Sequence, residues 1–163
     1  MKKLLAILLL TGTLFASCNT KSTSKSDENA IAEQTELAKS SDVVPFTEAK
    51  RYFANNTYKE AEVKKITNQE EFDSIFSPSP VMGKDGEPTT IDFSNNYVLA
   101  IIEAESNKTP EIIVNTLKQE DNVILLDYSL VNKEETTFTI KPTMILIIDN
   151  KYQGELKSIK TEK

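Results

Sequence analysis

The sequence lacks histidine and contains only one cysteine and four glycines. Without histidine, the chain has no Ser-His-Asp triad, no imidazole general base and none of the commonest zinc ligand. The single cysteine, Cys18, excludes an intramolecular disulfide. The glycines, at positions 12, 83, 86 and 154, form no phosphate-cradling loop. We therefore expect a protein that is not an enzyme, with no catalytic residues, no cofactor and no metal site.

The first 18 residues have the pattern of an export signal. Lys2 and Lys3 precede an apolar run over residues 4–10, and small residues lead to Cys18. The run is shorter than the ~20 apolar residues that span a bilayer. An ordinary cleaved signal and a retained transmembrane helix are the alternatives to a lipid-attachment signal.

The pair Ala16-Ser17 directly before Cys18 resembles the signal of bacterial lipoproteins. The resemblance implies cleavage before Cys18 and acylation of its thiol by chains such as palmitate. It places the protein in the bacterial cell envelope as a lipid-anchored membrane protein, because acyl chains supply lasting anchorage. Asn19 favours the outer membrane over the inner one without deciding between them.

Negative charge dominates the remaining chain. Removal of residues 1–17 leaves 17 basic and 25 acidic residues, a net charge of −8. Such a chain attracts phosphate backbones poorly, so we expect no nucleic-acid partner. The segment Gly83-Lys84-Asp85-Gly86 formally matches the GxxG of nucleic-acid-binding KH domains, but the acidity and the export signal argue against that function.

Composition divides the chain into three parts. A lipoprotein signal peptide covers residues 1–17, a lipid-anchored flexible tether covers 18–42, and a single domain covers 43–163. The tether is rich in Ser, Thr, Lys and Glu and has too few large apolar residues to offset the entropy of ordering.

The domain is predicted to be α+β, with two short helices packed on an antiparallel meander sheet of about five or six strands. The spacing of Phe46, Ala49 and Phe53 predicts a helix over residues 44–53. A capping box over Thr67–Glu70 predicts the second helix, with an apolar stripe of Phe72, Ile75 and Phe76.

Strands are expected at residues 97–102, 111–117, 123–131, 136–140, 143–148 and 155–160. The continuous apolar run 97–102 is typical of a strand covered on both faces. In the strand expected at residues 123–131, apolar and polar residues alternate, so we predict that one face turns inward. That face consists of Ile124, Leu126, Tyr128 and Leu130. Asp127 should face outward, and Phe138 and Ile140 should face inward.

The order of these segments gives a second resemblance, over roughly residues 60–160. The phrases Ile91-Asp92-Phe93-Ser94 and Tyr97-Val98-Leu99-Ala100 are similar to those of the PrcB C-terminal-like family. That family contains small bacterial lipoproteins, and its name comes from an accessory subunit of a surface protease complex. The chain differs from it at Glu105–Thr109, where the family often has a glycine-rich turn.

Residues 77–90, which we call the candidate loop, are the expected specialised surface. The loop is long for a compact domain and carries Val81 and Met82 among prolines and glycines, beside Lys84 and Asp85. We predict that these four residues bind an envelope protein partner. The alternative is that Val81 and Met82 merely cover one end of the sheet.

Two other kinds of site remain as alternatives. A small-ligand-binding envelope lipoprotein would need a concave, partly apolar cavity near Tyr52, Tyr97 or Tyr128. Glu103 and Glu105, with Glu111 across a hairpin, could form a weak cation site or a carboxylate pair, but we favour the simpler interpretation that they form the solvated end of a strand.

Overall fold

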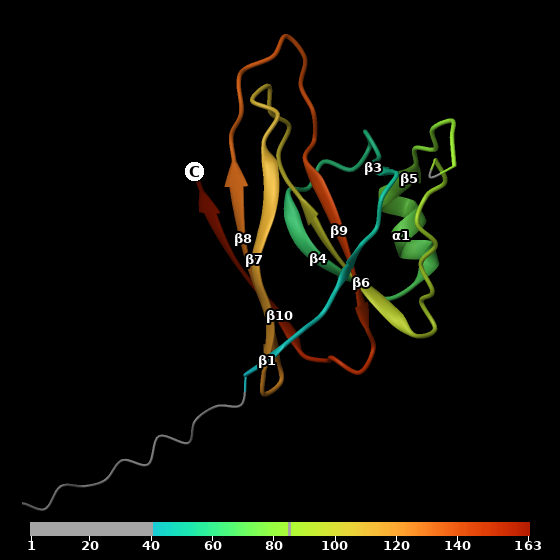
Figure 1. Ribbon diagram of the computed structural model, residues 1–163, viewed down its shortest axis with the longest axis vertical. Helices are drawn as coiled ribbons and strands as arrows, with labels where there is room; N and C mark the ends of the chain where they lie inside the picture. Colours follow the sequence, from blue (N-terminus) through green and yellow to red (C-terminus); the bar gives the residue numbers. More distant parts are fainter. Residues whose placement is uncertain (1–40, 85) are drawn as a thin grey trace, which may run out of the picture. The chain divides into compact units, whose positions relative to one another are not determined.

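The computed structural model describes residues 41–84 and 86–163, and this part of the chain is mostly β (Figure 1). One helix, α1, covers Gln69–Ile75. Ten strands form three sheets in the described residues: β1 Ser41–Val43, β2 Thr47–Glu48, β3 Tyr52–Ala54, β4 Glu62–Ile66, β5 Phe76–Pro78, β6 Asn96–Ile102, β7 Glu111–Glu120, β8 Val123–Val131, β9 Thr143–Asp149 and β10 Glu155–Glu162. The predicted α+β fold with two helices on one meander sheet is therefore wrong.

Two four-stranded sheets pack against each other. The first has the order β1-β7-β8-β10 and the second the order β2-β9-β6-β4. Side chains from both sheets form one core, which includes Leu99 of β6, Leu126 of β8 and Leu146 of β9, all at 0 % exposure. This core holds the two sheets together, because its residues leave water only when the sheets meet.

A second core lies on the other face of the β2-β9-β6-β4 sheet. There Val98, Ala100 and Ile102 of β6 pack with Phe72 and Ile75 of α1. Figure 1 shows α1, β3 and β5 on this side of β6 and β9, with β7 and β8 on the opposite side. Strand β6 is thus covered on both faces, which confirms the prediction from its continuous apolar run.

The predicted helix over residues 44–53 does not form. The backbone N–H of Val44 donates to the Leu117 carbonyl at 2.9 Å, and that of Ala49 donates to the Ile145 carbonyl at 2.8 Å. These donors are therefore committed to two different sheets and cannot make helical hydrogen bonds. The buried residues include Val44 and Ala49, whereas Phe46 and Phe53 are 42 % and 48 % exposed.

The second predicted helix is present as α1, one residue out of register at its start. Asn68 is the N-cap, and its side-chain oxygen accepts the Glu71 N–H at 2.8 Å. The carboxylate of Glu71 pairs with Lys64 at 3.2 Å and does not return to the cap. The apolar residues of the predicted stripe, Phe72, Ile75 and Phe76, are all buried, although Phe76 is the first residue of β5 and not part of the helix.

The predicted strands form, with one exception, but their connections are not those of a meander. The hairpin β7-β8 is antiparallel, and the inward face of β8 is confirmed by the burial of Ile124 and Leu126. Strand β10, however, does not pair with β9, the strand that precedes it in the chain. It belongs to the other sheet and pairs with β8 in parallel, from Glu155 opposite Val123 to Glu162 opposite Leu130. Short connections alone do not reveal such a change of sheet.

Residues 136–140 were expected to be a strand and are not one. They belong to the connection between β8 and β9, where Ile140 makes only an isolated bridge with Ser106. Phe138 is 58 % exposed, so its predicted inward orientation is wrong. Alternating apolar residues indicate a strand only where a neighbouring strand takes their backbone hydrogen bonds.

The segment Ile91–Ser94 supports the entry into β6. The Asp92 carboxylate accepts the Ser94 N–H at 2.9 Å, and its carbonyl accepts the Asn96 N–H at 2.9 Å. Hydrogen bonds from the Asn95 side chain and Ser94 backbone lower the pKa of Asp92. Ile91 and Phe93 pack on the second core, so this phrase is a structural framework.

The predicted signal peptide, Cys18 and most of the tether lie outside the described residues. Strand β1 begins at Ser41, two residues before the predicted start of the domain, and Asp42 opposes Gln119 of β7. No helix in residues 41–84 or 86–163 is long and apolar enough to cross a membrane.

Candidate functional site

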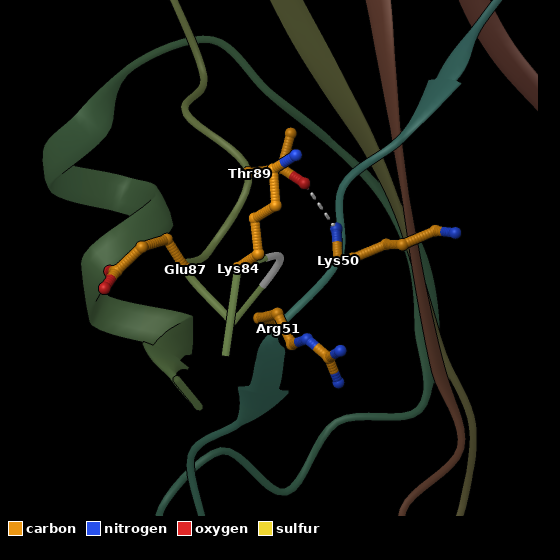
Figure 2. A pocket seen from close by; sticks show the side chains of 5 residues that line it. All are labelled: Lys50, Arg51, Lys84, Glu87 and Thr89. Atoms are coloured by element: carbon orange, nitrogen blue, oxygen red, sulfur yellow. Dashed lines mark hydrogen bonds between the residues drawn. The ribbon is translucent and has the colours of Figure 1, made fainter. Parts of the chain in front are cut away.

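The candidate loop is fastened at both ends to the segment that enters β3. The Ser79 N–H donates to the Arg51 carbonyl at 2.8 Å. The Lys50 N–H donates to Thr89 Oγ1 at 2.9 Å, as Figure 2 shows, and the Thr89 N–H donates back to the Lys50 carbonyl at 3.1 Å. The Tyr52 hydroxyl donates to the Thr89 carbonyl at 2.9 Å. The base of the loop is therefore held in one arrangement.

The tip of the loop is a tight turn that depends on glycine. The Val81 N–H donates to the Gly86 carbonyl at 2.9 Å, and the Gly86 N–H donates to the Gly83 carbonyl at 3.2 Å. A Cβ on Gly86 would lie 1.7 Å from the Val81 carbonyl oxygen, so no other residue fits without rearrangement.

The loop presents its apolar side chains to solvent. Met82 is fully exposed, at 101 %, and Val81 is 47 % exposed. Met82 therefore does not cover the end of the sheet, which corrects the alternative prediction for this residue, whereas Val81 is about half buried. Lys84 is also exposed, and Asp85 lies outside the described residues.

A cleft lies beside the loop. It has a volume of about 580 Å³ and is lined by Lys50, Arg51, Lys84, Glu87 and Thr89 (Figure 2). No ion pair joins its three cationic side chains to an acidic residue of the described chain. In Figure 2 the Glu87 carboxylate lies on the side of α1, while Lys50 and Arg51 extend to the opposite side. The described lining of the cleft therefore carries three positive charges and one negative charge.

Arg51 occupies an unusual backbone conformation in this cleft. Its φ of 68° is left-handed, a region that non-glycine residues enter at a cost of roughly 1–2 kcal/mol. The hydrogen bonds of Lys50 and Arg51 to the candidate loop hold this conformation in place. Both residues lie in the segment that was predicted to be a helix, so the cleft was not predicted from the sequence. The usable signal was a Lys-Arg pair containing the only arginine of an acidic chain.

The carboxylates considered as a cation site do not come together. Glu103 is 6 % exposed; its Oε1 accepts the Tyr128 hydroxyl at 2.8 Å, and its Oε2 lies 3.2 Å from Lys160 Nζ. Glu105 is exposed, and Glu111 pairs with Lys133 at 2.9 Å. Residues 41–84 and 86–163 contain no group of three or more His, Cys, Asp or Glu that could hold a metal ion.

The two groups that contact the Glu103 carboxylate, the Tyr128 hydroxyl and the Lys160 ammonium, both have raised pKa values. Burial, followed by the hydrogen bond to Glu103, raises the pKa of the Tyr128 hydroxyl. The hydrogen bond to Glu103 is the main cause of the raised pKa of Lys160. The cluster thus holds a buried carboxylate between two donors, which is a structural arrangement joining the two sheets.

A ligand cavity was predicted near Tyr52, Tyr97 or Tyr128, and none of these three residues is among those that line the cleft. Tyr97 and Tyr128 belong to the core between the two sheets, whereas Tyr52 packs edge-on against Phe72, with ring centroids 5.1 Å apart. The Tyr97 hydroxyl is buried without a hydrogen-bond partner among the described residues, and burial raises its pKa to about 12. Its ring lies under Lys65, whose Nζ is 4.3 Å from the centroid.

Comparisons with protein-family models, with curated proteins and with solved structures give no match to this chain.

Proposed function

We propose that the protein is a lipid-anchored lipoprotein of the bacterial cell envelope that binds another envelope protein and catalyses no reaction. The candidate loop is the proposed contact, and an accessory subunit of an envelope or surface complex is the kind of role it would have. The observation that carries the proposal is the full exposure of Met82 on a loop whose two ends are hydrogen-bonded to the domain.

A fastened loop favours binding for an entropic reason. Ordering a flexible segment at an interface costs free energy, and a loop already held by Arg51, Thr89 and their partners has paid much of that cost before contact. Methionine adapts its shape to a partner surface, so Met82 suits the centre of such a contact. Burying Met82 would contribute roughly 1.5–3 kcal/mol before other costs, and Val81 would contribute less because it is only 47 % exposed.

Attachment to a membrane would strengthen a modest interface. Confinement at one surface raises the effective concentration of the domain toward other anchored proteins. This part of the proposal depends on acylation of Cys18. Replacing Cys18 by Ser should release the protein from membranes, and an unmodified thiol in the wild-type protein would contradict the anchor.

The partner contact can be tested by chemical crosslinking in intact envelopes, followed by purification of the protein and identification of what is attached. Val81→Ser together with Met82→Ser should weaken capture of a specific partner without lowering the melting temperature. The matched control is Phe138→Ser, which removes an exposed apolar side chain from another loop. Equal capture by all three proteins would remove the candidate loop from the interface.

A further inference from the structure

The cleft beside the candidate loop concentrates positive charge in an acidic domain. Residues 41–163 contain 14 Lys and Arg against 21 Asp and Glu, a net charge of −7. Around the cleft this balance is reversed, because its described lining residues include three cations, Lys50, Arg51 and Lys84, and one acid, Glu87. None of these three cations forms an ion pair with a described acid, so an anionic ligand in the cleft would meet positive charge that the described residues do not compensate.

The backbone around the cleft positions one of these cations in particular. Arg51 is held at a φ of 68° by bonds from its neighbours, the Lys50 N–H to Thr89 and the Ser79 N–H to its own carbonyl. A strained non-glycine residue persists where the surrounding structure fixes it, and such residues cluster at ligand sites. Arg51 presents a guanidinium fork, which matches the paired oxygens of a phosphate.

A neutral donor lies in the same cleft. Thr89 Oγ1 accepts the Lys50 N–H at 2.9 Å, and the hydroxyl proton has no acceptor among the described residues. It can therefore donate to a ligand oxygen. Hydroxyl, guanidinium and ammonium donors together form a donor set suited to an anion that carries several oxygens.

We propose that this cleft binds a phosphate group carried by a small organic molecule or by a lipid headgroup. The four described ionic side chains of the lining sum to a charge of +2, which complements a phosphate dianion. The volume of about 580 Å³ exceeds the space that one phosphate needs and lies within the range of about 300–1,000 Å³ of small-molecule sites. This site does not depend on the partner contact at Met82.

The test is a titration of the full chain, labelled with ¹⁵N and kept in non-ionic detergent, followed by NMR. Three soluble probes distinguish the sources of the phosphate: inorganic phosphate, glycerol 3-phosphate as a monoester, and glycerophosphoglycerol as the deacylated headgroup of phosphatidylglycerol. Sodium chloride at equal ionic strength controls for screening. We expect saturable shifts at the amides of Lys50, Arg51 and Lys84, and the probe that binds most tightly identifies the source.

Arg51→Asn removes the guanidinium while keeping a residue that tolerates the left-handed conformation. It should weaken the tightest probe at least tenfold, as should Lys84→Gln. The control Lys157→Asn removes an exposed positive charge from β10, outside the cleft, and should leave binding unchanged.

The site is supported if the amide chemical-shift changes are confined to residues of the cleft and disappear in the Arg51→Asn variant. Equal weakening by Arg51→Asn and Lys157→Asn, or no saturable shift with any of the three probes, would overturn it. The double variant Val81→Ser, Met82→Ser separates the two proposals, because it should lose partner capture and still bind the phosphate probe.

Discussion

The Nζ of Lys160 lies 3.2 Å from Oε2 of Glu103, and this pair joins the edge strand of one sheet to the end of a central strand of the other. Glu103 is almost fully buried, and the Tyr128 hydroxyl occupies its second oxygen. An inward-pointing lysine on an edge strand also discourages pairing with another chain. The contact therefore stabilises the sandwich and protects its edge.

Lys160→Met should lower the free energy of unfolding by roughly 1–3 kcal/mol, because the buried Glu103 would lose its charged donor. The Lys160 side chain is 37 % exposed, so solvent screening keeps the loss below that of a fully buried pair. Lys157→Met, at an exposed position on the same strand, should stay within about 0.5 kcal/mol of wild type. Urea unfolding measures both, and equal losses would mean that the pair contributes nothing specific.

The two core tyrosines should respond in opposite ways to loss of the hydroxyl. Tyr128→Phe removes a donor from Glu103 and should cost roughly 1–3 kcal/mol. Tyr97→Phe removes a buried hydroxyl that has no partner among the described residues, so stability should be unchanged or rise by about 1 kcal/mol. Thermal unfolding at neutral pH compares them. A large loss in Tyr97→Phe would reveal a hydrogen bond at that hydroxyl.

Stability should fall as the pH rises above 10. Burial raises the pKa of Tyr97 from 10.0 to about 12, so the folded protein keeps a proton that the unfolded chain loses between these values. Because the folded state then binds more protons, the free energy of unfolding decreases with increasing pH in this window. Tyr97→Phe should show a shallower decrease between pH 10 and pH 12. An identical slope in the variant and wild type would place the alkaline transition elsewhere.

Gly154 should tolerate no side chain. A Cβ there would lie 2.7 Å from the carbonyl carbon and oxygen of Asn122, at the turn where the Glu155 N–H donates to the same carbonyl. Gly154→Ala should therefore displace the start of β10 and cost more than Gly83→Ala. Gly83 has a φ of 122° but no atom within 4 Å of the added Cβ, so only backbone strain of roughly 1–3 kcal/mol applies. Equal melting temperatures of the two variants would contradict this account of the turn.

The local pattern of apolar residues correctly predicted the strands in which that pattern follows directly from which faces are buried. The run 97–102 indicated a doubly covered strand, and the alternation of Ile124 and Leu126 gave the correct inward face. Phe46 and Phe53 were misread because their spacing suits a helix face, whereas long-range hydrogen bonds direct this segment into three sheets. Such bonds leave no periodic trace in the sequence.

The candidate loop could be predicted from the sequence, whereas the cleft could not. Prolines and glycines around Val81 and Met82 marked the loop within one stretch of sequence. The cleft combines Lys50 and Arg51 with Lys84, more than thirty residues later, and hydrogen bonds of Ser79 and Thr89 bring the two segments together. A site assembled from separate segments has no local motif.

The most direct test of partner binding by the candidate loop is site-specific photocrosslinking in intact cells. A photoreactive amino acid replaces Met82 in one strain and Phe138 in another, and both positions are exposed on loops. We predict a discrete crosslinked adduct of one size from position 82 and none of that size from position 138. The absence of an adduct at position 82, or the same adduct from both positions, would contradict the proposal.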